Sequence, residues 1–152
     1  MTKNYGCKGI ATACFLILSI AFNVAYANTT LDCSSRNETP AHKLKVEVVL
    51  VNDTTLADVD VSLLDETTGK YNRLVGCETV TATEFNPRDP SLTAFNRFQI
   101  QKSRESSYNL FLPKNISELI SNEANESVEA LIRVAFDEGR PFTDKLDCRI
   151  RP

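Results

Sequence analysis

Apolar and polar residues alternate along several short stretches of the chain. In the stretch from residue 44 to 51, Leu44, Val46, Val48 and Leu50 fall on one face when every second position is counted. The same period recurs later, so we expect further strands that contain Val59–Val61–Leu63, Phe98–Ile100, Tyr108–Leu110–Leu112, Val128–Phe136 and Leu146–Ile150. The last two stretches each offer one apolar and one polar face, which is typical of antiparallel strands.

Polar turns separate these stretches. The segment DETTGK contains Gly69 and predicts a hairpin between the runs on either side of it. The pattern from residue 71 to 85 is less regular, and the segment NPRDPSLTAFN contains Pro87 and Pro90 and predicts a loop. One short helix is expected near residues 115–122, where Asn115 and Glu118 have the spacing of a capping box.

Strands of this number and spacing predict an all-β fold. About seven short strands in one domain favour a single antiparallel β-sandwich, similar to immunoglobulin-like and transthyretin-like sandwiches in strand rhythm only. A small barrel is the alternative. No motif links the chain to a known family, and fold alone does not give function.

The first 27 residues have the pattern of a cleaved secretory signal peptide. Lys3 and Lys8 precede an apolar run, and Ala25 and Ala27 supply small residues at a cleavage site. We therefore expect residues 1–27 to be a signal peptide, 28–43 a polar N-terminal arm and 44–152 the sandwich domain. This predicts a secreted protein, or a periplasmic one if the source is bacterial, without stable insertion into a membrane.

Composition narrows the class of partner. Two of the 17 Lys and Arg residues and none of the 20 Asp and Glu residues lie in the signal peptide, which leaves 15 against 20, a net charge of −5. A mildly acidic domain does not favour nucleic acid as a partner. The mature chain keeps Cys33, Cys77 and Cys148. Three cysteines allow one disulfide, with Cys77–Cys148 preferred here, and the odd cysteine is either buried or forms a disulfide-linked dimer.

Candidate catalytic and metal-binding groups are sparse. Cys33 and His42 would make a nucleophile pair without an orienting third group, and adding Cys77 and Cys148 would give a zinc site that lacks the usual short ligand spacings. Two acidic groups would offer oxygens to Ca²⁺ if they met at one end of the domain: Asp53, Asp58 and Asp60, and Asp137, Glu138 and Asp144. The same acids would form a glycosidase pair, but the chain has no Trp to stack against a sugar. We expect no cofactor.

Glycosylation acceptors are the one enriched motif. Five asparagines stand in Asn-x-Ser/Thr sequences: Asn28, Asn37, Asn52, Asn115 and Asn125. They predict a glycoprotein if the source is eukaryotic.

The sequence favours a secreted, non-enzymatic binding protein that recognises another protein or extracellular macromolecule through loops or an edge strand. Leu92, Phe95 and Phe142 are the candidate apolar binding residues, because loops flank them. A Ca²⁺-dependent adhesion or lipid-binding module and a small secreted hydrolase are the alternatives.

Overall fold

A computed structural model describes residues 28–36, 43–103, 105–122, 126–137 and 139–151. The predicted signal peptide, His42, Asn37, Asn125 and Glu138 lie outside these residues. Among the described residues, no helix has the length and apolar character needed to cross a membrane.

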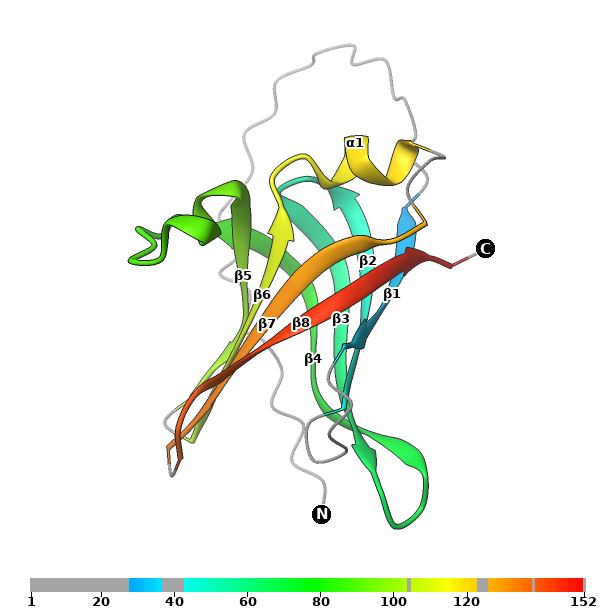
Figure 1. Ribbon diagram of the computed structural model, residues 1–152, viewed down its shortest axis with the longest axis vertical. Coiled ribbons are helices and arrows are strands. Elements are labelled where there is room, and N and C mark those ends of the chain that lie inside the picture. The colour runs from blue at the N-terminus through cyan, green and yellow to red at the C-terminus, as the bar shows by residue number, and fades with distance from the viewer. Residues whose placement is uncertain (1–27, 37–42, 104, 123–125, 138, 152) are drawn as a thin grey trace, which may run out of the picture.

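Eight antiparallel strands form a closed barrel in which each strand pairs with its neighbours in the sequence (Figure 1). They are β1 (Thr29–Ser35), β2 (Leu44–Asn52), β3 (Thr55–Asp65), β4 (Lys70–Thr83), β5 (Phe95–Lys102), β6 (Ser106–Pro113), β7 (Val128–Phe136) and β8 (Phe142–Ile150). A short 3-10 helix (η2, Pro90–Ala94) precedes β5, and the helix α1 (Ile116–Ser121) lies between β6 and β7.

The predicted two-sheet sandwich of about seven strands is therefore wrong, because the first strand pairs with the last. Leu31 of β1 lies opposite Ile150 of β8, and Ser35 lies opposite Leu146. The segment 28–43, expected to be a polar arm, supplies this eighth strand through Thr29–Ser35. Only Leu31 and Cys33 mark its apolar face, so its alternation is too short to stand out in the sequence.

The predicted disulfide is also corrected. Cys148 is bonded to Cys33 and not to Cys77. The pairing of β1 with β8 puts Cys33 directly opposite Cys148, whereas Cys77 lies on β4. The bridge joins residues that are 115 positions apart and closes the barrel covalently where its first and last strands meet.

Apolar side chains fill the interior of the barrel. Each strand turns every second residue inward, and the fully buried residues include Leu31, Val46, Val48, Leu56, Val59, Val61, Phe98, Ile100, Leu110, Ile132 and Leu146. An eight-stranded barrel is just wide enough for side chains to fill it or for one small ligand to occupy it. Here the side chains form one continuous core.

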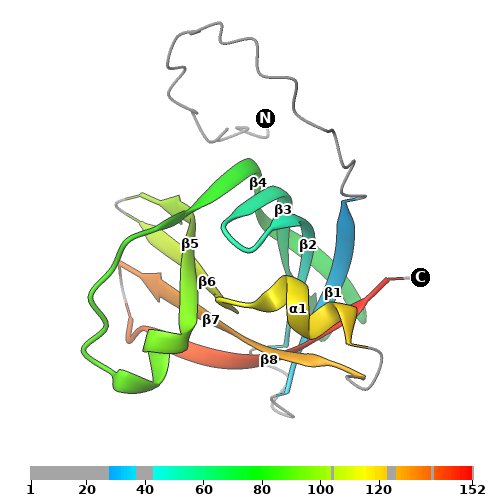
Figure 2. The ribbon, with the colours of Figure 1, turned by 90° about the horizontal axis from the view of Figure 1, so that it is seen from above.

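The two ends of the barrel differ. The helix end carries the β2–β3 turn, the β4–β5 loop and α1, which lies across the mouth in the view from above (Figure 2). Ile116 of α1 is fully buried and closes the core at this end. The hairpin end carries the β3–β4, β5–β6 and β7–β8 turns.

The predicted hairpin and helix are confirmed, with one change in the helix cap. Gly69 has a φ of 65° in the turn between β3 and β4, a conformation that glycine adopts without strain. Asn115 precedes α1 but its side chain makes no capping hydrogen bond. Instead, the Ser117 N–H donates to a carboxylate oxygen of Asp53 in the β2–β3 turn, at 2.7 Å. The first turn of α1 is therefore capped by Asp53, a residue distant in the sequence, and not by Asn115.

The seam between β4 and β5 is the weakest in the barrel. Within the described residues, only Ala82 with Phe98 and Thr83 with Arg97 are registered between them. The seam between β7 and β8, by comparison, is registered from Val128 to Val134. β4 and β5 diverge from the helix end towards the hairpin end (Figure 1). We call this divergence the β4–β5 split.

A local backbone distortion accompanies the split. Thr79 of β4 has a φ of 53°, the left-handed region that a β-branched residue rarely adopts. Cys77 and Val80, two inward-facing residues, are separated by the two exposed residues Glu78 and Thr79. The distortion interrupts the regular strand near the point where pairing with β5 ends, as bulges commonly do.

Replacing Thr79 with glycine is expected to raise the free energy of unfolding. Relief of the left-handed conformation gives about 1–2 kcal/mol, and the added freedom of the unfolded chain removes about 0.5–1 kcal/mol. Urea unfolding would therefore show a net gain of about 0.5–1 kcal/mol for Thr79→Gly. Thr81→Gly, at an exposed β4 position with negative φ, is the matched control and should lower stability. Equal losses in the two variants would contradict the assignment of strain to Thr79.

Candidate functional site

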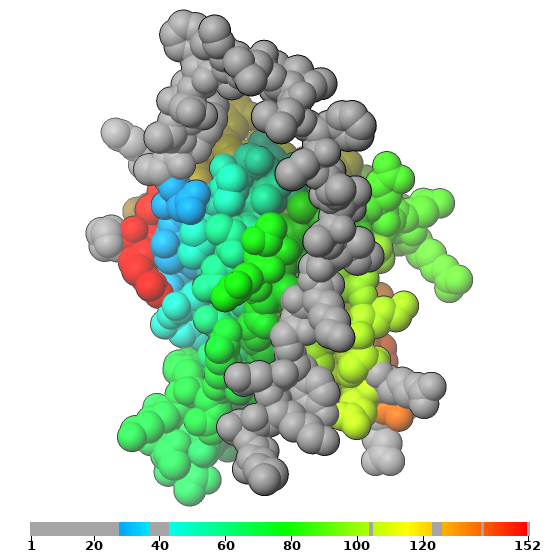
Figure 3. All heavy atoms as spheres, turned by 180° about the vertical axis from the view of Figure 1, so that it is seen from behind, coloured from blue at the N-terminus to red at the C-terminus, as the bar shows by residue number. Residues whose placement is uncertain are grey.

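An open groove lies at the helix end of the barrel, beside the β4–β5 loop. Its volume is about 760 Å³. The loop projects from the body of the molecule, as does the β3–β4 hairpin at the opposite end (Figure 3). The residues that line the groove come from the β2–β3 turn, the end of β4, the loop, the start of β5 and the β6–α1 connection: Thr54, Ala82, Thr83, Glu84, Phe85, Asn86, Pro87, Leu92, Thr93, Phe95, Asn96 and Lys114. We call it the mouth groove.

Arg97 of β5 holds the first part of the β4–β5 loop in place. Its Nε donates to Thr83 Oγ1 at 3.0 Å, and its Nη2 donates to the Glu84 carbonyl at 3.1 Å. The guanidinium carbon lies 5.2 Å from the centre of the Phe85 ring, a cation–π arrangement. Phe85 also packs edge to face on Phe111 of β6, with ring centres 5.6 Å apart. The loop is thereby fixed on the outer surface of β5 and β6.

Further hydrogen bonds fix the remaining walls of the mouth groove. Asp89 caps η2 by accepting the Ser91 N–H at 2.9 Å, and this hydrogen bond is the main reason that the pKa of Asp89 is lowered. The Lys114 N–H donates to the Ala94 carbonyl at 2.9 Å. The Asn96 side-chain amide donates to the Asp53 carbonyl at 2.7 Å. A groove whose walls are ordered before binding costs less entropy when a ligand enters.

The mouth groove combines apolar side chains with polar and charged ones. Phe85, Pro87, Leu92 and Phe95 provide apolar area, and the amides and hydroxyls around them provide hydrogen-bonding groups. Glu84 and Lys114 are the charged residues among those that line it. Neither His nor Cys is among the residues that line it.

The structure brings together two of the three predicted binding residues. Leu92 and Phe95 both line the mouth groove, whereas Phe142 begins β8 at the hairpin end and packs partly buried against the core. Sequence reasoning missed Phe85, although an aromatic residue directly before the proline-containing loop was a usable signal.

The acids and cysteines considered from the sequence as metal-binding or catalytic groups do not lie together at one place. Asp53 lies at the helix end, Asp58 and Asp60 lie on β3, and Asp137 and Asp144 lie at the hairpin end. No group of three or more metal-ligating side chains occurs among the described residues. Cys33 and Cys148 are used in their disulfide, so neither is available as a thiolate ligand to a metal ion. Asp144 is buried inside the barrel and accepts a hydrogen bond from the Ser35 hydroxyl.

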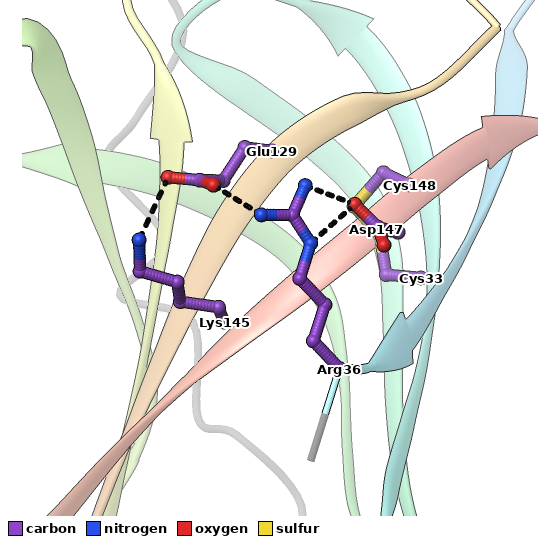
Figure 4. Close-up of polar contacts among 6 residues, drawn as sticks. All are labelled: Cys33, Arg36, Glu129, Lys145, Asp147 and Cys148. Atoms are coloured by element: carbon purple, nitrogen blue, oxygen red, sulfur yellow. Dashed lines mark hydrogen bonds and ion pairs between the residues drawn. A yellow bond between two sulfur atoms is a disulfide. The ribbon is translucent and has the colours of Figure 1, made fainter. Parts of the chain in front are cut away.

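A second cluster of charged side chains covers the outside of the β1–β8 seam. It spans β2, β1, β8 and β7 and consists of four acids and four bases: Asp32, Glu47, Glu129, Asp147, Arg36, Lys45, Lys145 and Arg151. We call it the charge belt. Arg36 joins Asp147 of β8 to Glu129 of β7, with Nε donating to Asp147 at 2.7 Å and Nη1 to Glu129 at 2.6 Å (Figure 4).

The charge belt is internally neutral and links neighbouring strands. Arg151 donates to Asp32 of β1 at 3.0 Å through Nε and lies 2.9 Å from Glu47 of β2 through Nη2. The hydrogen bond from Arg151 is the largest cause of the lowered pKa of Asp32. Those from Lys45 and Arg36 act likewise on the pKa values of Glu47 and Asp147. Since its members neutralise one another, we assign the belt to structure.

Comparison with known proteins finds no matching family model, no matching curated protein and no matching solved structure.

The charge belt predicts a loss of stability in acid. A carboxylate with a lowered pKa stabilises the folded state above its ordinary value, 3.8 for Asp32 and Asp147, and this contribution is lost as the pH falls through the lowered value. The free energy of unfolding should therefore stay level from pH 7 to 5 and fall below pH 4. Urea unfolding at pH 7, 5 and 3 measures it.

Arg151→Gln should reduce this acid effect, because it removes the partner of Asp32 and Glu47. At pH 7 the loss of exposed ion pairs should cost less than about 1 kcal/mol. The difference in stability between pH 7 and pH 3 should then be smaller than in the unsubstituted protein. Arg133→Gln, at an exposed position of β7 without an ion pair within the described residues, is the control. An unchanged acid effect in Arg151→Gln would remove the belt as its cause.

Proposed function

We propose that this is a secreted, non-enzymatic binding protein that holds an apolar segment of another macromolecule in the mouth groove. The observation that carries the proposal is the fixed loop wall, in which Arg97 and Phe111 hold Phe85 beside Leu92 and Phe95. Apolar anchors surrounded by polar groups are the usual arrangement of a protein-binding hot spot. The filled interior supports a ligand site at the surface rather than inside the barrel.

Secretion is part of the same proposal. The disulfide between Cys33 and Cys148 suits an oxidising compartment, which agrees with a signal peptide at residues 1–27. Three of the five glycosylation acceptors lie within the described residues, and Asn28, Asn52 and Asn115 are all exposed. Thr54, which lines the mouth groove, is the last residue of the motif that begins at Asn52. Lys114, which also lines the groove, directly precedes Asn115. In a eukaryotic source, glycans at Asn52 and Asn115 would border the mouth groove.

A display library of random twelve-residue peptides tests the binding proposal. Peptides selected on the purified protein should contain apolar residues and should lose at least tenfold in affinity for Leu92→Asp, because a carboxylate in the groove replaces apolar contact. Ile150→Asp is the matched control, since Ile150 is an exposed aliphatic residue of β8 that does not line the groove. Selection of no peptide, or equal losses in the two variants, would contradict the proposal.

A further inference from the structure

Two residues of opposite charge border the mouth groove on either side of β5. Glu84 directly follows β4, and Lys114 directly follows β6. β5 lies between these strands, with Arg97 registered opposite the last residue of β4 and Phe95 opposite the last residue of β6. The groove therefore has an acid on its β4 side and a base on its β6 side.

The main chain holds both charged residues in place and leaves their side chains exposed. The Glu84 carbonyl accepts a hydrogen bond from Arg97 Nη2 at 3.1 Å, and the Lys114 N–H donates to the Ala94 carbonyl at 2.9 Å. Both side chains are exposed, and neither has an ion pair within the described residues. The carboxylate of Glu84 and the ammonium group of Lys114 are thus available to a ligand in the groove.

Three other charged groups around the groove are engaged by contacts of their own. Asp53 accepts the Ser117 N–H, and Asp89 accepts the Ser91 N–H. The Arg97 guanidinium lies against the Phe85 ring. Glu84 and Lys114 are the charged residues that line the groove itself, so we take them as the pair that a ligand meets.

The strand register sets the distance between these two charges. Two strand spacings across the sheet and two residues along it separate the backbones of Glu84 and Lys114 by about 12 Å. In an extended peptide, residues four positions apart span about 13 Å and point to the same face. The first and fifth residues of such a segment would then meet the two charges. The third residue, on the same face, would meet Leu92 and Phe95, which line the groove.

We propose that the mouth groove selects an extended protein segment with two oppositely charged residues four positions apart and an apolar residue midway between them. This inference rests on the proposed function, because it specifies the segment that the groove holds. Glu84 binds the basic residue, Lys114 binds the acidic one, and the apolar residue supplies most of the affinity. Exposed charges add little affinity, but they discriminate between ligands because a like charge at the same position is repelled.

A display library tests this selection. In its twelve-residue peptides, two positions four apart are each Lys or Glu, the position midway is Leu or Phe, and the other positions are random uncharged residues. Sequencing before and after selection on the purified protein measures the enrichment of each charge class. The two opposite-charge classes should be enriched about fivefold over the two like-charge classes, since each wrong charge replaces a weak attraction by a weak repulsion.

Two changes of condition should remove this preference. Selection in about 1 M NaCl should equalise the classes, because salt at that concentration screens exposed charges. A library with the charged positions eight apart should also show no preference, because about 26 Å of extended chain cannot bring both charges to Glu84 and Lys114 together.

Charge-reversed variants of the protein locate the selecting residues. Glu84→Lys leaves two bases beside the groove, so the Glu/Glu class should become the most enriched. Lys114→Glu leaves two acids, so the Lys/Lys class should become the most enriched. Glu66→Lys and Lys70→Glu are the matched controls, because they make the same changes at exposed residues of the β3–β4 hairpin without an ion pair in the described part of the chain. Both controls should keep the opposite-charge classes ahead.

The failure of this inference can be told apart from the failure of the proposed function. Equal enrichment of the four charge classes, in peptides whose selection depends on Leu92, would overturn the inference and leave the proposed function standing. Control variants that shift the preferred class as far as the groove variants do would have the same consequence. If no selected peptide is lost with Leu92→Asp, both proposals are overturned.

Discussion

The pairing of the first strand with the last is the constraint on which the rest of the structure depends. An eight-stranded antiparallel sheet that stayed open would have two exposed edges and an uncovered apolar face. Pairing β1 with β8 removes both problems, because the apolar face becomes the inside of a barrel. The seam is joined in three ways: main-chain pairing, the Cys33–Cys148 bridge on the inside and the charge belt on the outside.

The strength of this seam explains where the candidate binding surfaces lie. β4 and β5 stand on the wall opposite β8 and β1 in the strand order, and their seam has the shortest registered stretch within the described residues. The long loop between them projects from the barrel and forms one wall of the mouth groove. The β1–β8 wall thus maintains the fold, while the opposite wall carries the mouth groove. Less stable regions commonly serve binding in this way.

Local patterns in the sequence predicted most of the strands but not their closure. The alternation at Val128–Phe136 and Leu146–Ile150 predicted β7 and β8, Gly69 predicted the hairpin turn, and Asn115 predicted where α1 begins. A sandwich and a barrel require the same alternation along each strand, because each strand buries one face in both. What separates them is the pairing of residues more than 100 positions apart, here Cys33 with Cys148, and no local pattern encodes it.

The residues of the mouth groove were predictable from the sequence only in part, because local patterns do not show which distant strands lie side by side. Leu92 and Phe95 were predicted to be binding residues because they are apolar and close to a loop, and both line the mouth groove. Phe142 is also an apolar residue beside a loop, but it lies at the other end of the barrel. Its position follows from the direction of β8 in the closed fold. The clamp of Arg97 on Phe85 was beyond sequence reasoning, because it joins residues on two strands whose pairing was unknown.

Removal of the bridge tests the central role of the β1–β8 seam most directly. The measurement is the free energy of unfolding in urea for the protein with Cys33→Ser and Cys148→Ser, compared with the oxidised protein. A closed loop of 115 residues predicts a loss of about 5 kcal/mol from chain entropy, enough to leave a domain of this size marginally stable or unfolded in water. A loss below about 1 kcal/mol would contradict the account, because barrel closure would then not depend on this seam.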